Sequence, residues 1–216
     1  MPFLLANGRT NQVTTLPAPT GGWNARDNIA KMKPEDAVRL VNLFPGVASV
    51  DLRGGYSAHV TGLPAQVETL MEYSGGATDK MFAASGTAFY DVTSAGAVGA
   101  AVVTGLSNAR WEYSNITTAG GNYLYAANGV DAPRLYDGTN WTAITGVSVP
   151  AITGVTTTTL HCPTLFKNRM WFIQANTLKA WYLPTNAVSG AAASLDLSAI
   201  ARKGGYLVAM GAWTLD

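Results

Sequence analysis

The side chains best suited to catalysis in this chain belong to two histidines and one cysteine, namely His59, His161 and Cys162. A cysteine thiolate activated by an imidazole base is the nucleophile of several enzyme classes. Consecutive residues of a regular strand point to opposite faces, however, so His161 and Cys162 should not face each other. We therefore expect Cys162 to be a small buried hydrophobic residue. Neither histidine has the H-x-x-x-H spacing of a helical metal site.

The other polar residues form no recognisable catalytic or binding motif. The sequence contains neither the phosphate-binding pattern G-x-x-x-x-G-K-[ST] nor the dinucleotide-binding pattern G-x-G-x-x-G. Asp131, Asp137 and Asn140 lie in one turn-rich segment, but their spacing fits no calcium loop, and turn formation explains such residues. No pair of carboxylates stands out for glycoside hydrolysis. We expect no catalytic residue, no metal and no cofactor, and we predict that the chain is not an enzyme.

The 216-residue chain is poor in charge, with 12% charged and 48% hydrophobic residues, where an average soluble protein has about 25% charged residues. Its formal net charge of +1 provides no basic surface for tight nucleic-acid binding, and its apolar content argues against disorder. Charged residues are depleted at the core of protein interfaces. The low charge therefore predicts either a surface largely covered by partners or a β-protein whose surface is rich in Thr, Ser and Asn.

Residues 1–30 are expected to form an extended N-terminal arm. They show no steady hydrophobic period, and Pro2, Pro17 and Pro19 prevent a regular helix. The arm ends in a glycine-containing turn that carries Trp23. We expect this arm to lie against its own body or against a neighbouring chain.

Residues 31–62 are expected to form one helix and a connecting strand. Pro34 suits the first position of a helix, and the acidic residues after it suit the first turn. One apolar helix face is formed by residues at i, i+3, i+4 and i+7, namely Ala37, Leu40, Val41 and Phe44. The pattern predicts a helix over about residues 34–44, ended by Pro45-Gly46.

Residues 63–216 have the pattern of repeated β-structure, with short apolar strands separated by glycine-containing turns. The strand aromatics Phe82, Tyr125 and Phe172 align at spacings of 43 and 47 residues. All-β repeats of this length are typical of β-propeller blades, and a β-sandwich with similar hairpins is the alternative. About three and a half units fit, where a propeller has roughly four to eight blades. We therefore expect propeller-like blades that are incomplete here, in a chain that continues beyond Asp216.

Four short motifs occur in a fixed order before the repeats, namely Gly22-Trp-Asn24, Pro34-Glu-Asp-Ala-Val-Arg-Leu-Val-Asn42, Phe44-Pro-Gly46 and Leu52-Arg-Gly-Gly-Tyr56. This order, followed by blade-like repeats, resembles the N-terminal portion of the tail hub or nozzle proteins of short-tailed bacteriophages, which are also called tail tubular or tail accessory proteins. The resemblance covers residues 17–60, and it extends more loosely to the repeats.

The resemblance implies a structural protein of the virion tail that is made in the bacterial host cytoplasm. Proteins of this family form a ring, usually a hexamer, below the portal and adaptor, and the ring continues the channel for genome ejection. Double-stranded DNA would pass without sequence-specific binding, and this chain would not insert into a membrane. The family provides no catalytic residues to carry over. The expected assembly residues of the arm and helix face are Trp23, Ala37, Leu40, Val41 and Phe44.

Two other function classes remain open from the sequence. The chain has six Trp and nine Tyr, which could form the sugar-binding platforms of a carbohydrate-binding β-propeller, such as a receptor-binding or lectin-like module. The repeating aromatics lie in strands beside Ala and Met, however, where they suit core packing better than ligand binding. A propeller or sandwich hydrolase is disfavoured because histidines and carboxylates are sparse.

Overall fold

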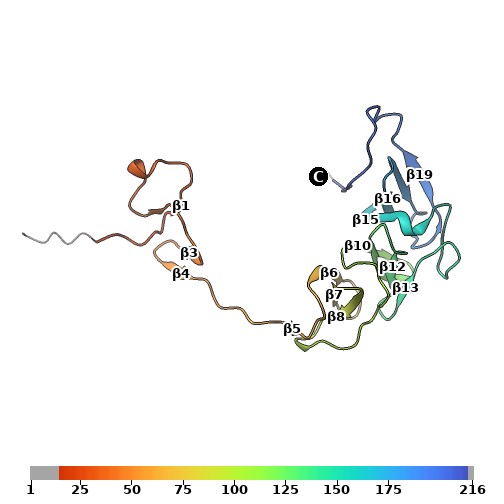
Figure 1. The fold of residues 1–216 in the computed structure, drawn as a ribbon, viewed down its shortest axis with the longest axis horizontal. Coiled ribbons are helices and arrows are strands. Elements are labelled where there is room, and N and C mark those ends of the chain that lie inside the picture. Colours follow the sequence, from red (N-terminus) through yellow and green to blue (C-terminus); the bar gives the residue numbers. More distant parts are fainter. Residues whose placement is uncertain (1–14, 214–216) are drawn as a thin grey trace, which may run out of the picture. The chain divides into compact units, whose positions relative to one another are not determined.

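The computed structural model describes residues 15–213 of the chain. It is mainly β, with 39% strand and 3% helix, and the strands form several small sheets. The residues group into two compact units, which are Met1–Ser57 (unit 1) and Ala58–Asp216 (unit 2) (Figure 1). Unit 1 therefore takes in both the predicted arm and most of the predicted helical region. The first 14 residues of that arm lie outside the described residues.

Unit 1 is built from short strand pairs and one 3-10 turn, η1 (Ile29–Lys31). Two strands, β1 (Gly22–Trp23) and β2 (Asp36–Ala37), pair in parallel. The next two, β3 (Leu43–Pro45) and β4 (Val50–Leu52), form an antiparallel hairpin. In this hairpin the amide of Gly46 donates to the Ser49 carbonyl over 2.7 Å and closes the turn.

The helix predicted over residues 34–44 is wrong, because this segment forms β2, an irregular stretch and β3. The carbonyls that an α-helix would use internally accept hydrogen bonds from residues earlier in the chain. The Glu35 carbonyl accepts from the Gly21 amide over 2.8 Å, and the Ala37 carbonyl accepts from the Asn24 amide over 2.9 Å. In addition, Phe44 precedes a proline, a position at which the helical backbone is disfavoured. The i, i+3, i+4, i+7 spacing is therefore present in the sequence without a helix.

Unit 2 contains three antiparallel sheets that follow one another along the chain. Within each sheet, the strands are paired in the order in which they occur in the sequence. The first sheet consists of β6 (Val67–Tyr73), β7 (Lys80–Ser85) and β8 (Ala88–Asp91). The second consists of β10 (Glu112–Thr118), β11 (Gly121–Ala127), β12 (Arg134–Tyr136) and β13 (Trp141–Ala143). The third consists of β15 (Leu160–Phe166), β16 (Arg169–Gln174), β17 (Lys179–Tyr182) and β19 (Ala193–Asp196).

In the first and third sheets, a short parallel pair joins the segment before the sheet to the segment that follows its third strand. These pairs are β5 (Val60–Thr61) with β9 (Gly96–Ala97), and β14 (Ile152–Thr153) with β18 (Gly190–Ala191). A second 3-10 turn, η2 (Thr157–Thr159), precedes β15. The same connection therefore occurs on both sides of the second sheet, which indicates that the repeat includes the connecting segments.

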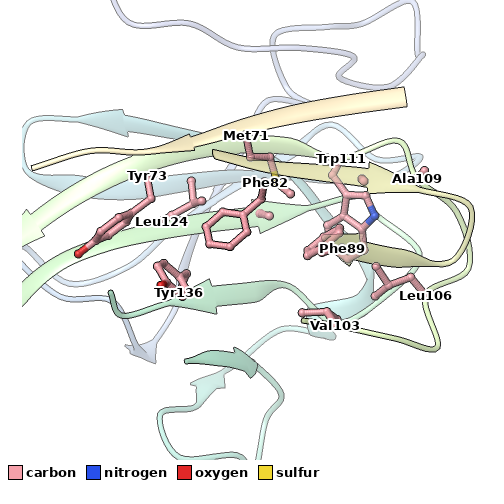
Figure 2. Packing of buried hydrophobic residues seen from close by; sticks show 12 residues of the cluster. Met71, Tyr73, Phe82, Phe89, Val103, Leu106, Ala109, Trp111, Leu124 and Tyr136 are labelled. Carbon is pink, nitrogen blue, oxygen red and sulfur yellow. The ribbon is translucent and has the colours of Figure 1, made fainter. Parts of the chain in front are cut away.

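The second sheet is buried on both faces because its side chains alternate between two hydrophobic clusters. Leu124 and Ala126 belong to the cluster shared with the first sheet, while Tyr125 between them belongs to the cluster shared with the third sheet. Figure 2 shows the first cluster, where Phe82 and Phe89 from the first sheet lie over Leu124, Trp111 and Tyr136. Because successive side chains of a strand point to opposite faces, the second sheet packs against the first sheet on one face and the third on the other. The three sheets therefore form one stack in chain order.

Candidate functional site

The five assembly residues expected from the sequence lie in unit 1 without a hydrophobic core around them. Trp23, Val41 and Phe44 are exposed, with exposed fractions of 69%, 54% and 60%. Ala37 and Leu40 are half-buried. The structure brings Trp23 and Ala37 together as pairing partners of β1 and β2. Because there is no helix, the other three do not share a helix face with Ala37.

The exposed apolar surface of unit 1 extends well beyond these five residues. None of the hydrophobic side chains described in unit 1 is among the buried core residues of the chain. Its large exposed hydrophobic residues are Leu16, Trp23, Ile29, Val38, Val41, Phe44, Val47, Leu52 and Tyr56. Single exposed apolar residues are normal on a protein surface, whereas large contiguous apolar patches are typical of interaction sites. In the sequence, the low content of charged residues was the feature that pointed to a surface covered by partners.

Polar hydrogen bonds hold the backbone of unit 1 in place. The Asn24 side-chain amide donates to carboxylate oxygens of Asp27, over 2.9 Å, and of Asp36, over 2.8 Å. The Trp23 indole Nε1 donates to the Val38 carbonyl over 3.1 Å, which fixes one edge of the ring while the side chain stays exposed. Unit 1 therefore presents apolar side chains from a backbone fixed by polar contacts, which lowers the entropy lost on binding.

His161 and Cys162 meet at a carboxylate that the sequence did not single out, that of Glu112 on β10. The His161 Nδ1 lies 3.3 Å from Glu112 Oε2, and the Cys162 amide donates to the same oxygen over 2.5 Å. The hydrogen bond with His161, together with that from the Cys162 amide, holds the pKa of Glu112 below its usual value. A register shift between His161 and Thr164 lets both neighbours reach one oxygen. The arrangement ties β15 to β10.

Cys162 itself is buried and is oriented toward the chain's own backbone. Its thiol lies 3.4 Å from the amide nitrogen of Met210, and its side chain is 8% exposed. His161 instead lines a polar cavity of about 370 Å³ at the ends of β6, β10 and β15. The cavity's charged residues are largely paired, since Arg110 Nε lies 3.2 Å from Glu68 Oε1. This geometry is that of a polar junction between sheets, with the Cys162 thiol buried beside it.

The turn-rich segment with Asp131, Asp137 and Asn140 is held by hydrogen bonds within its turns and to Ser107. Asp131 accepts from the Ser107 amide over 2.9 Å and from the Ser107 hydroxyl over 2.7 Å. Asp137 accepts from the Asn140 amide over 2.7 Å within its turn. Among the residues that the structure describes, no group of three or more His, Cys, Asp or Glu side chains is arranged to hold a metal ion.

The repeating aromatic residues pack on one another inside the stack. Phe82 contacts Tyr136 and Trp141 edge to face, with ring centroids 4.9 and 5.0 Å apart. Beside them a second cavity of about 370 Å³ is lined by Trp141 and by the ion pair of Lys80 and Asp91, whose charged atoms are 2.8 Å apart. Most of these aromatic rings therefore belong to the hydrophobic core, and Trp141 also lines the second cavity.

No protein-family model matches the chain, and no curated protein sequence is significantly similar to it. In the part of the chain from residue 15 to residue 213, the structure contains no helix that is long and apolar enough to cross a membrane.

Proposed function

We propose that this chain is a ring-forming structural subunit of a bacteriophage tail, of the hub or nozzle type. It would attach below the portal or adaptor and continue the channel through which DNA is ejected. The observation that carries the proposal is that unit 1 exposes its large apolar residues while none of its described hydrophobic side chains is buried. A segment of this kind obtains a hydrophobic core only when a partner covers it.

The sheet stack of unit 2 supports the same proposal. Three successive antiparallel sheets, packed face to face in chain order, are the arrangement expected of β-propeller blades. We propose a propeller-like fold for unit 2 on this basis. Such a domain is a rigid body, which suits a subunit whose role is mechanical.

The charge of the chain agrees with a channel that conducts DNA without holding it. Tight DNA binding needs many Lys and Arg contacts to phosphates, whereas the net charge here is +1 and only 12% of residues are charged. A weakly charged ring would let the double helix pass during ejection. We accordingly propose a structural role without catalysis.

Negative-stain electron microscopy of the purified chain tests the proposal. We expect closed rings, with a hexamer as the leading symmetry. Immunogold labelling of phage particles made in the host should place the chain in the tail below the portal. A chain that stays monomeric at high concentration and is absent from virions would refute the assignment.

The alternative, a carbohydrate-binding propeller, has one observation in its favour. The cavity beside Trp141 combines an indole with Lys80, Asp91 and Asn140, which are residue types that bind sugar hydroxyls. A glycan array with the purified chain separates the two proposals. Specific sugar binding that is lost in Trp141→Ala, without ring formation by the parent chain, would favour this alternative.

A further inference from the structure

The three sheets of unit 2 use matching surfaces to contact one another. We call the face that a sheet turns toward the preceding sheet its rear face, and the opposite face its front face. On the second sheet and the segment before it, the rear surface is formed by Val103, Leu106, Leu124 and Ala126. Met71, Phe82 and Phe89 from the front face of the first sheet fill it. The third sheet repeats this arrangement, since its rear residue Phe172 packs under Tyr125 of the second sheet.

The first sheet carries the same rear surface 43 residues earlier in the chain. The corresponding residues are Val60, Leu63, Met81 and Ala83, each 43 positions before its counterpart on the second sheet. All four line a cavity of about 300 Å³ together with Leu70 and Val92. Among the described residues of unit 2, none fills this cavity as Phe82 fills its counterpart, and Leu70 at its rim is 56% exposed. We call this rear face of the first sheet the acceptor surface, because its residues match those with which the second sheet receives the first.

The opposite end of the stack offers a matching donor. Residues that alternate with Phe172 on the third sheet form its front face, where Trp171 and Tyr182 stack with ring centroids 4.5 Å apart. An apolar cavity of about 160 Å³ opens beside Trp171, and Leu195 on β19 is 46% exposed. The front faces of the first two sheets are buried under the next sheet, whereas within residues 58–213 the front face of the third sheet is covered only partly, by the segment around Met210.

We propose that the rear face of the first sheet binds the front face of the third sheet of a second copy of this chain. The contact repeats between chains the junction that already joins the first sheet to the second and the second to the third within one chain. Because it joins two different surfaces, it is a head-to-tail contact, which closes into a ring when the rotation from copy to copy allows. It is carried by unit 2 alone and rests on the ring-forming function proposed above, which electron microscopy tests separately.

The chemistry of the acceptor surface suits a β-sheet better than a small polar ligand. Its lining is formed by aliphatic side chains and one methionine, with His59 at the edge. The His59 Nε2 lies 3.0 Å from the Val92 carbonyl oxygen, so that ring is used in holding the segment before β5 against the first sheet. A further sheet that inserts an aromatic residue, as Phe82 and Tyr125 do, would complete the surface.

Photo-crosslinking from Leu70 tests the proposal. A benzophenone amino acid placed at position 70 is irradiated in a mixture of ¹⁴N- and ¹⁵N-labelled chains, and crosslinked peptides are mapped by mass spectrometry. We expect mixed-isotope crosslinks to peptides from residues 160–196. Crosslinks only within one chain, or to the first sheet of another copy, would overturn the head-to-tail contact between copies.

Sedimentation of matched charge variants provides an independent readout. Leu70→Glu places a charge on the acceptor surface, whereas Val130→Glu places it at a residue with a similar exposed fraction, 58%, in the loop between β11 and β12. Burying an unpaired carboxylate should weaken association through this surface by at least about tenfold. Val130→Glu should associate as the parent chain does. Equal association of the parent chain and both variants, or a monomeric parent chain, would contradict the proposal.

Discussion

The rings of Tyr125 and Phe172 meet edge to face across the junction of the second and third sheets, with centroids 5.4 Å apart and an interplanar angle of 74°. Tyr125 is fully buried, and its hydroxyl donates to the Val188 carbonyl over 2.5 Å. The same burial raises the pKa of Tyr125. This pair joins two strands that are distant in sequence, β11 and β16, and it anchors the cluster that holds the third sheet to the second.

Phe172→Ala should be among the most destabilising single changes in unit 2. The side chain is 1% exposed, and its removal would leave a cavity under Tyr125. Truncations of this kind cost about 3–5 kcal/mol. Urea unfolding followed by tryptophan fluorescence measures the loss. Phe166→Ala is the control, because that side chain is 37% exposed on β15 and should cost far less. Equal effects of the two changes would contradict the stacked arrangement.

Glu112→Gln should reduce the stability of unit 2 in a pH-dependent manner. Contacts with His161 and Cys162 lower the pKa of Glu112 in the folded chain. A carboxylate with a lowered pKa contributes stability above its unfolded pKa, about 4.3, and this contribution disappears as the pH falls through the folded pKa. The difference in unfolding free energy between parent and variant should therefore be present at about pH 7 and shrink toward about pH 3.

Denaturant unfolding at several pH values measures this difference. Glu72→Gln, at an exposed position on β6, is the matched control and should show a smaller difference across the range. If the difference in unfolding free energy between the parent chain and Glu112→Gln stays constant down to the lowest pH, the carboxylate charge does not hold β10 to β15.

Local sequence patterns predicted the strands and turns of unit 2 but not the register of their repeat. The alignment placed Phe82, Tyr125 and Phe172 at equivalent positions. Phe82 and Tyr125 do lie on the front faces of their sheets, but Phe172 lies on a rear face and contacts Tyr125. A one-residue slip moves a strand side chain to the opposite face. Aromatic spacing alone was therefore not sensitive enough to fix the register.

A second sequence feature accompanies the repeat in the segments before the sheets. The dipeptide Thr-Gly precedes each sheet, and its glycine has a positive φ in every case: 85° at Gly62, 73° at Gly105 and 90° at Gly154. A hydrophobic residue precedes each Thr-Gly pair, but the same pattern occurs at Ile144-Thr-Gly146, where the glycine has no positive φ. The Thr-Gly pairs lie in the segments that connect the sheets, whereas the aromatic residues at spacings of 43 and 47 lie in the strands.

The features that the sequence did not reveal depend on contacts between distant residues. The segment around Ala37 is extended because carbonyls there accept hydrogen bonds from Gly21 and Asn24, more than ten residues earlier. Likewise, Glu112 becomes a junction residue only because β15 lies beside β10. Hydrophobic periodicity reports local preference, and these tertiary contacts override it.

Gly154→Ala should destabilise the connection that leads into the third sheet. The φ of 90° is unfavourable for any residue with a Cβ, and that Cβ would lie 3.0 Å from the Ala192 carbonyl oxygen. The backbone conformation alone costs about 1–2 kcal/mol. Differential scanning calorimetry measures the resulting fall in Tm. Gly99→Ala is the matched control, because a Cβ there meets open space and no positive φ is required. A Tm in Gly154→Ala as high as in Gly99→Ala would be inconsistent with the constrained turn.

Phe44→Glu should abolish assembly through unit 1 while leaving unit 2 folded. Phe44 is 60% exposed on β3, so its replacement removes no buried contact from the sheet stack, but it places a charge on the surface that we propose a partner covers. Assembly is followed by sedimentation and by electron microscopy, and the folding of unit 2 by the near-ultraviolet circular dichroism of its buried aromatic residues. Ser94→Glu is the control, because it adds the same charge at an exposed turn of unit 2. Assembly of Phe44→Glu as strong as that of the parent chain would exclude this part of unit 1 from the subunit contact. A loss in Phe44→Glu without one in Leu70→Glu would assign assembly to unit 1 and not to the sheet stack.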